Sequence, residues 1–192
     1  KKIKVPLTDN HDILAKKLSL ISSELLIKAL TRIESLAELS TEARLSKLNL
    51  VSQSNSQERI TYARMIKKQD YLLDWDKKGI CIHQKVMALY PNAYSYYRFK
   101  RVKILNTIPF SEEYATYLPK KAIEYLDKII KTREAPGKIL EIIKNIGIVV
   151  STSDTPILIT EIQLEGKRST TSASMIQQLN PVSDKLFTNY SN

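Results

Sequence analysis

The chain has 192 residues, 43% of them hydrophobic, and a formal net charge of +10. This length holds one sizeable domain, or one domain with a fragment of another. No apolar run approaches the roughly 18 residues that cross a bilayer, and the basic start lacks the apolar segment of a signal peptide. A single cysteine excludes an internal disulfide and fits a reducing cytosol.

The first 34 residues predict a short strand followed by a long helix. "KKIKVPL" alternates in polarity and stops at Pro6, and Thr8, Asp9 and Asn10 are residues that cap helix starts. One strand and one helix cannot bury both of their faces, so we expect this segment to be the edge of a larger domain. The helix has one apolar stripe, with residues at steps of three and four: Leu14, Leu18, Ile21, Leu25, Leu26, Leu30 and Ile33.

Residues 35–60 lose this period and end in "VSQSNSQE", which predicts a linker. Beyond it, "DWDKKGICIHQKVMALYP" predicts a helix from Asp76 to Leu89, and "AYSYYRFKRVKIL" predicts a hairpin or one long strand. Residues 111–134 have the pattern of an amphipathic helix. Three short β runs follow, at 138–143, 147–152 and 157–164, and a final helix begins at Ser172. With their short turns, these elements form a pattern typical of a small barrel.

The positive charge is concentrated in one part of the chain. Residues 51–110 hold eleven Lys/Arg against four Asp/Glu, whereas residues 111–192 hold ten of each. A local excess favours a polyanion such as RNA, although a solvated Lys-rich surface has the same composition. Tyrosines interleaved with cations suit base stacking, and equally a barrel core with a solvated rim. The candidate RNA-binding residues are Lys67, Lys68, Arg98, Lys100, Arg101, Lys103, Lys167 and Arg168.

The cations between residues 98 and 103 would not form a uniform face if this segment were one strand. Alternate residues of a strand share a face. Tyr97, Phe99 and Arg101 would then lie on one side. Arg98 and Lys100 would lie on the other, so each side would mix charged and apolar side chains.

The last two candidates, Lys167 and Arg168, are adjacent on a turn. They follow Gly166 and separate the final β run from the final helix. A solvated turn commonly carries charge, and a turn that faces an anionic ligand carries the same residue types. The sequence leaves both interpretations open.

No catalytic or metal-binding group of residues is visible in the sequence. Neither histidine stands near a nucleophile pattern, and the four glycines form no phosphate-binding loop. We expect His83 to be an exposed helix residue, since no second ligand stands at metal spacing. We expect Cys81, within an apolar run, to be a small buried residue. These features favour a binding module over a catalyst.

Several segments, in order, resemble the C-terminal half of the methionyl-tRNA formyltransferase family. They are "ITYARMIKKQDYLLDW", "ALYPNAY", "VKIL", "APGKILEI" and "LEGKRSTTSASMI", and the opening resembles the last strand and helix of that family's catalytic domain. Three features depart from the family pattern: Met65 in place of Lys, Phe99 in place of Gly, and an insertion at 111–134. The groups that carry the resemblance best are Thr61-Tyr62-Ala63, Asp74-Trp75, Ala135-Pro136-Gly137 and Gly166-Lys167-Arg168.

The resemblance implies an α+β fold in which residues 1–34 finish a formyltransferase catalytic domain, 35–60 link, and 61–192 form an OB-like β-barrel with flanking helices. It implies formyl transfer from 10-formyltetrahydrofolate, as co-substrate, to the amino group of initiator methionyl-tRNA in translation initiation. The expected protein is a monomer without a metal, located in the bacterial cytoplasm or in an organelle. The family's catalytic Asn, His and Asp and its folate loop have no counterparts here, so we expect the chain to bind tRNA and to be inactive alone.

Two alternatives remain. The chain could be the C-terminal domain of another formyltetrahydrofolate-using enzyme, in which the barrel does not bind RNA, or it could be a stand-alone RNA-binding module. The charge excess over residues 51–110 favours RNA binding over the first alternative. The isolated strand and helix at 1–34 argue against the second, because a free-standing module would not need them.

Overall fold

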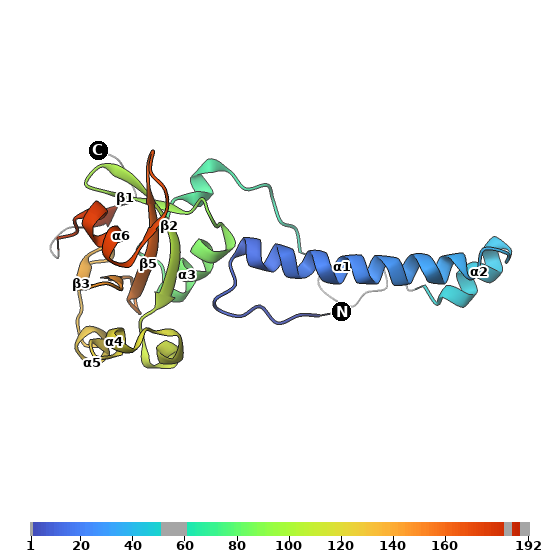
Figure 1. Ribbon diagram of the computed structural model, residues 1–192, viewed down its shortest axis with the longest axis horizontal. Helices are drawn as coiled ribbons and strands as arrows, with labels where there is room; N and C mark the ends of the chain where they lie inside the picture. Colours follow the sequence, from blue (N-terminus) through green and yellow to red (C-terminus); the bar gives the residue numbers. More distant parts are fainter. Residues whose placement is uncertain (1, 51–60, 183–185, 189–192) are drawn as a thin grey trace. The chain divides into compact units, whose positions relative to one another are not determined.

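The structure, a computed structural model, describes residues 2–50, 61–182 and 186–188 (Figure 1). The described residues fall into two compact units. The larger unit holds those up to Asp12 and those from Lys67 onward, and the smaller unit holds Ile13–Ile66. The domain boundaries expected at residues 34 and 60 stay predictions, and residues 51–60 of the expected linker lie outside the described residues.

The smaller unit is helical. Helix α1 (His11–Glu34) confirms the long helix expected after the caps, and α2 (Thr41–Leu48) follows it within the expected linker. No residue of α1 is buried, and Leu26 and Leu30 of its apolar stripe are 60% and 56% exposed. The guanidinium of Arg44 holds the turn between the helices by donating to the carbonyl oxygens of Leu36, Ala37 and Leu39.

The strand expected before α1 is wrong for the described residues. Residues 2–6 pair with no strand. A strand exists only through its hydrogen-bonded neighbours, and the alternating polarity of this segment does not supply one.

The larger unit is built on one antiparallel sheet, which gives the chain a mixed α+β fold. Its described strands number seven, in the order β3-β4-β5-β2-β1-β7, with the short β6 beside β5. The three predicted β runs and the predicted hairpin are confirmed. The strands are β1 (Tyr94–Tyr97), β2 (Lys100–Pro109), β3 (Ile139–Ile143), β4 (Gly147–Val150), β5 (Ile157–Leu164), β6 (Thr170–Thr171) and β7 (Phe187–Thr188).

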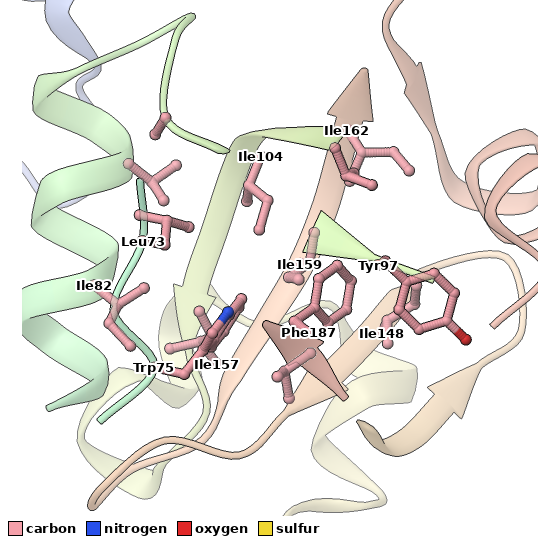
Figure 2. Close-up of a cluster of buried hydrophobic side chains, with 14 of the residues drawn as sticks. Leu73, Trp75, Ile82, Tyr97, Ile104, Ile148, Ile157, Ile159, Ile162 and Phe187 are labelled. Carbon is pink, nitrogen blue, oxygen red and sulfur yellow. The ribbon is translucent and has the colours of Figure 1, made fainter. Parts of the chain in front are cut away.

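The centre of the sheet is the pairing of β2 with β5. It runs from Val102 opposite Leu164 to Pro109 opposite Ile157, with register shifts around Asn106. The buried face of both strands is rich in Ile and Val, which suit a pleated, packed surface. The main core cluster lies between this face and helix α3, and includes Leu73, Trp75, Ile82, Tyr97, Ile104, Ile148, Ile157, Ile159, Ile162 and Phe187 (Figure 2).

The two outer strands of the sheet, β3 and β7, approach each other through the residues that precede them. Lys138 forms an isolated bridge with Leu186, and the Phe187 amide donates to the Gly137 carbonyl at 2.8 Å. Gly137 has φ +85°, and a Cβ at this position would collide with the Phe187 carbonyl. Glycine is therefore required where the two backbones meet, and the sheet is curled toward closure.

Helix α3 (Gly79–Ala88) packs on β2 and begins three residues after the expected start. Its first amide is capped from a distant segment, since Gly79 N donates to Asp154 Oδ1 at 2.8 Å. The expectations for two of its side chains are wrong. Cys81 is exposed, whereas His83 is only 3% exposed, because the buried face of α3 runs through positions 79, 82, 83, 86 and 87.

The single helix expected over residues 111–134 is three short helices. Pro119 starts the second of them, and proline is tolerated at a helix start but not in a helix interior. Their apolar sides form a second core cluster with the outer side of β4 and β5 at the Pro109 end of β2 (Figure 1). The helices are η3 (Glu112–Tyr117), α4 (Lys120–Ile123) and α5 (Leu126–Ile130).

The final helix, α6 (Ser172–Leu179), starts at the expected residue and packs on β4 and β5. Met175 and Leu179 are its buried residues. It ends at Asn180, which has φ +46°, a conformation typical of a helix C-terminus. This places the end of α6 near the Lys100 end of the sheet.

Candidate nucleic-acid interface

The β1–β2 hairpin ends in a two-residue turn, Arg98–Phe99. Both residues have positive φ (49° and 62°), as in a type I′ turn, whose twist matches the flanking strands. Neither residue is the Gly, Asn or Asp that tolerates this conformation best, and a positive φ costs other residues roughly 1–2 kcal/mol each. The turn holds Phe99 outward, with 69% of its side chain exposed.

The turn also changes the faces expected for a continuous strand. Tyr94 lies opposite Lys103 and Tyr96 opposite Arg101, so these four side chains share the outer face of the hairpin. The grouping of Arg101 with Tyr97 was therefore wrong, whereas the separation of Arg101 from Lys100 is confirmed, because Lys100 pairs with Tyr97 on the opposite face. A hairpin turn resets the alternation that the continuous-strand prediction assumed.

The outer face of the hairpin is ordered by ring contacts. The rings of Tyr94 and Tyr96 meet edge to face at 5.7 Å, and the Arg101 guanidinium lies 4.0 Å from the centroid of the Tyr94 ring. A cation over a tyrosine ring is attracted by the ring's electron density. The Arg101 guanidinium is thus held against an aromatic ring.

The turn after β5 brings a further cation to the same end of the sheet. Gly166 has φ +73° and is free of close neighbours, so glycine is needed there for its conformation and not for space. The Lys167 amide donates to the Leu164 carbonyl at 3.0 Å, and Gln163 Nε2 donates to the Lys167 carbonyl at 2.9 Å. The backbone of the turn is fixed by these bonds, while the Lys167 side chain is exposed.

These parts enclose a groove of about 890 Å³, which adjoins a smaller hollow of about 180 Å³. The lining residues come from the hairpin, from the end of β5 with the turn after it, and from the end of α6. We call the two together the basic groove. Among the described residues that line it, Glu165 is the single carboxylate. Five lining residues are cations: Arg98, Lys100, Arg101, Lys103 and Lys167.

The structure thus brings together five of the eight predicted RNA-binding residues. The other three lie outside the basic groove and are exposed. Lys67 and Lys68 lie at the start of η2 (Lys68–Tyr71), where the Lys67 amide donates to Asp70 Oδ2 at 2.6 Å. Arg168 lies one residue beyond the lining of the groove.

The sequence reasoning missed the contribution of α6. Gln178, Leu179 and Asn180 line the groove, about 80 positions along the chain from the hairpin. No local pattern distinguishes a glutamine that faces a groove from one that faces solvent. Gln178 differs from its neighbour Gln177 in being half-buried, which only the packing of α6 on the sheet determines.

Two polar atoms in the groove lining are buried and have no hydrogen-bond partner among the described residues. They are Arg101 Nε, which is a donor, and Gln178 Oε1, which is an acceptor. Buried polar groups in proteins are nearly always paired. Both atoms thus have hydrogen-bonding capacity that the described residues leave unused.

Two further kinds of site are not found in the part of the chain that the structure describes. There, no group of three or more His, Cys, Asp or Glu side chains is placed to hold a metal ion. Across the same residues, no helix is both long and apolar enough to cross a membrane.

The larger unit is thus an α+β domain in which a curled antiparallel sheet with flanking helices carries a basic groove. Residues 65–180 match the family "Formyl transferase, C-terminal domain", and the chain belongs to this family. It is 40% identical over 182 residues to the methionyl-tRNA formyltransferase of a Prochlorococcus marinus strain, across 93% of this chain and 52% of the relative. It is 38% identical to the enzyme of the same name from Synechococcus sp. (strain CC9311), across 97% of this chain and 55% of the relative. The chain therefore spans about half the length of these relatives.

Solved structures support the fold. A variant of HypX from Aquifex aeolicus superimposes on 92% of this chain and 27% of its own length, with a TM-score of 0.58 and 16% identity. A second HypX variant gives a TM-score of 0.52 over 84% of this chain and 24% of its own, at 17% identity. At this identity the similarity concerns the fold alone.

Proposed function

We propose that this chain is the C-terminal half of an enzyme that transfers a formyl group from 10-formyltetrahydrofolate to the amino group of initiator methionyl-tRNA. The family assignment and the names of relatives that match over nearly the whole chain support this function. In this proposal the chain supplies tRNA binding in translation initiation. The site for the formyl donor and the groups that transfer protons belong to the half of the protein that the chain does not span.

The observation that carries the proposal is the convergence of cations on the basic groove. Five cationic side chains from two separate segments surround it, and one carboxylate, Glu165, opposes them. Lys and Arg beside exposed aromatic rings match a phosphate backbone with accessible bases. Lys67, Lys68 and Arg168 remain proposed phosphate contacts outside the groove.

Finer features of the fold belong to the same proposal. The sheet is an OB-like barrel, which the bridge between Lys138 and Leu186 supports by joining the two outer strands. Residues 1–34 form the end of the catalytic domain, residues 61–192 form the tRNA-binding domain, and residues 35–60 are the linker between them. The exposed apolar stripe of α1 supports this division, because it offers a face for a missing part of the protein to cover. The protein is a monomer of the bacterial cytoplasm or of an organelle.

The test is the salt dependence of tRNA binding by a groove variant and a matched control. Arg98, Lys100 and Lys167 are exposed and are changed together to Gln. The control changes three exposed lysines at the opposite end of the sheet: Lys120, Lys121 and Lys144.

Both variants lose three charges, so a general effect of net charge is the same in each. Each lost phosphate contact lowers the slope of log affinity against log salt by about 0.7–0.9. We expect the groove variant to lose up to about 2–3 in slope and the control to change little. Equal losses in both variants would refute a groove-centred tRNA site, and the absence of tRNA binding by the wild type would favour the formyltetrahydrofolate-using enzyme whose barrel does not bind RNA.

A further inference from the structure

The basic groove has the dimensions of a site for a small group. Its main part holds about 890 Å³, within the range of roughly 300–1,000 Å³ in which proteins enclose molecules of nucleotide size. Its walls come from three directions: the hairpin tip, the end of β5 and the end of α6. A surface that only follows a phosphate backbone needs cations and no such enclosure.

An aromatic ring stands at the edge of this groove. Phe99 lines it with most of its ring exposed, and Tyr96 lines it from the neighbouring strand. With 69% of its side chain exposed, Phe99 buries little of its apolar surface against the described residues. Exposed aromatic rings in RNA-binding proteins are the surfaces on which unstacked bases lie.

The groove also offers one donor and one acceptor that the protein leaves unused. Arg101 Nε and Gln178 Oε1 are buried in its lining without a hydrogen-bond partner among the described residues. The contact of the Arg101 guanidinium with the Tyr94 ring, 4.0 Å from its centroid, holds this side chain at the groove. A nucleobase presents both donors and acceptors along its edges, whereas the phosphodiester groups of an RNA backbone only accept and could not satisfy the Nε and the Oε1 together.

We propose that the basic groove receives one unstacked nucleotide of the bound RNA. Its base stacks on Phe99 and its edge pairs with Arg101 Nε and Gln178 Oε1, while Lys100 and Lys167 hold the adjoining phosphate. This assignment rests on the proposed RNA-binding function. It adds a preference for a bulged or unpaired nucleotide over a continuous duplex.

The experiment compares two RNA hairpins that differ only by one bulged nucleotide. A 2-aminopurine at the bulge reports stacking through quenching of its fluorescence. Loss of one base–aromatic stack corresponds to about a 5- to 150-fold change in affinity. We expect the full chain to prefer the bulged hairpin by a factor in this range and to quench the probe.

Phe99→Gly separates binding from folding, because glycine adopts the positive φ at this turn more easily than phenylalanine. We expect this variant to be at least as stable as the wild type, to lose the preference for the bulge, and to leave the probe unquenched. Phe99→Trp retains the preference. The control is Tyr117→Ala, which removes an exposed aromatic ring on η3, outside the groove; it leaves the preference unchanged.

The polar pair has its own matched variants. Gln178→Leu removes the unused acceptor, and Gln177→Leu changes its exposed neighbour on the same helix. We expect only Gln178→Leu to reduce the affinity for the bulged hairpin while leaving the affinity for the paired hairpin unchanged. Equal effects of both variants would contradict the proposed base contact.

The outcomes distinguish this inference from the function on which it rests. If both hairpins bind with equal, salt-dependent affinity that Lys100→Gln weakens, the RNA-binding function holds and the nucleotide site is refuted. If neither hairpin binds, both are refuted. Displacement of the bulged hairpin by AMP at similar concentration would overturn the assignment to RNA and identify a site for a free nucleotide.

Discussion

We predict that the larger unit loses stability as the pH falls from 8 to 5.5, because the fold holds His83 in its neutral form. The side chain is 3% exposed, and both ring nitrogens are engaged. Nε2 lies 3.0 Å from the Leu7 carbonyl, which can only accept, so Nε2 donates. In the neutral ring, Nδ1 then accepts from the Thr107 hydroxyl at 3.0 Å.

Desolvation of the buried ring lowers the pKa of His83 below its ordinary value of 6.5, although the backbone at Leu7 and Thr107 acts in the opposite direction. The unfolded chain therefore binds a proton at a pH where the folded chain does not. The stabilising contribution is complete above pH 6.5 and is lost as the pH falls below it. The slope cannot exceed about 1.4 kcal/mol per pH unit, which limits the loss between pH 8 and 5.5 to about 1.4 kcal/mol.

The assay is urea unfolding followed by tryptophan fluorescence. The chain has one tryptophan, Trp75, which is 2% exposed in the core of the larger unit, so the signal reports the unit that contains His83. His83→Gln removes the titrating group, and His11→Gln is the control, since His11 is an exposed histidine on α1. We expect the free energy of unfolding of the wild type and of the control to fall relative to His83→Gln over this interval. Parallel curves for all three proteins would refute the reasoning.

Three further predictions concern the framework of the same unit. Ser95→Ala leaves the buried Trp75 Nε1–H, now bonded to Ser95 Oγ at 2.9 Å, without an acceptor, which we expect to cost about 1–3 kcal/mol in urea unfolding; the cost should shrink in a Trp75→Phe background, and an undiminished cost would contradict this origin. Asp154→Ala removes the cap on Gly79 and should cost about 0.5–2 kcal/mol at pH 7. Desolvation raises the pKa of Asp154, but hydrogen bonds outweigh this effect, so the pKa lies below 3.8. The stabilising contribution of the carboxylate is therefore lost only as the pH falls through the pKa of the folded protein. Urea unfolding at pH 7 and at pH 3 tests this, and a stability difference between wild type and variant that is the same at both pH values refutes it. Gly137→Ala places a Cβ at φ +85° against a backbone carbonyl and should cost more than the roughly 1–2 kcal/mol of the conformation alone; an unchanged melting temperature would contradict the close approach.

Periodicity and turn chemistry predicted most of the elements. The strands after residue 138, the hairpin and the helix from Ser172 were recognisable, because each satisfies its own local pattern. The interval 111–134 was misjudged as one helix, since its apolar spacing is helical on both sides of Pro119 while the proline interrupts the backbone. The local pattern therefore predicted correctly that this interval is helical, and predicted wrongly that it forms one continuous helix.

The faces of α3 show a second limit. Cys81 and His83 have the opposite exposures from those expected: Cys81 was expected to be buried because of its apolar neighbours, and His83 to be exposed because no second metal ligand stands near it. The buried position of His83 depends on a carbonyl 76 residues away and a hydroxyl on β2. A polar side chain can be buried when distant partners satisfy it, and a single sequence does not reveal those partners.

The candidate site shows how far charge alone can predict function. Five of the predicted cations line the groove, and four of them lie within the hairpin, where local sequence fixes their neighbourhood; their contact with RNA stays a prediction. Clustering in the sequence did not separate them from Lys67 and Lys68, which have the same chemistry but lie on another element. It also could not find Gln178, since its position depends on how α6 packs.

The groove is coupled to the core through Tyr97. This residue lines the groove, yet it is 2% exposed, its ring stacks at 5.1 Å on Phe187, and its hydroxyl accepts from the Val182 amide at 2.9 Å. Phe187 in turn lies against Trp75 at 5.4 Å (Figure 2). The floor of the groove is therefore part of a packed aromatic cluster, whereas its rim at Phe99 is exposed.

A site with a rigid floor needs little reorganisation to bind, which reduces the entropic cost of ordering a ligand. Recognition of an unpaired nucleotide depends on the shape of the groove, whereas attraction of the phosphate backbone depends mainly on its charge. Substitutions that loosen the aromatic cluster without changing the rim should therefore weaken the recognition of an unpaired nucleotide more than the attraction of the backbone.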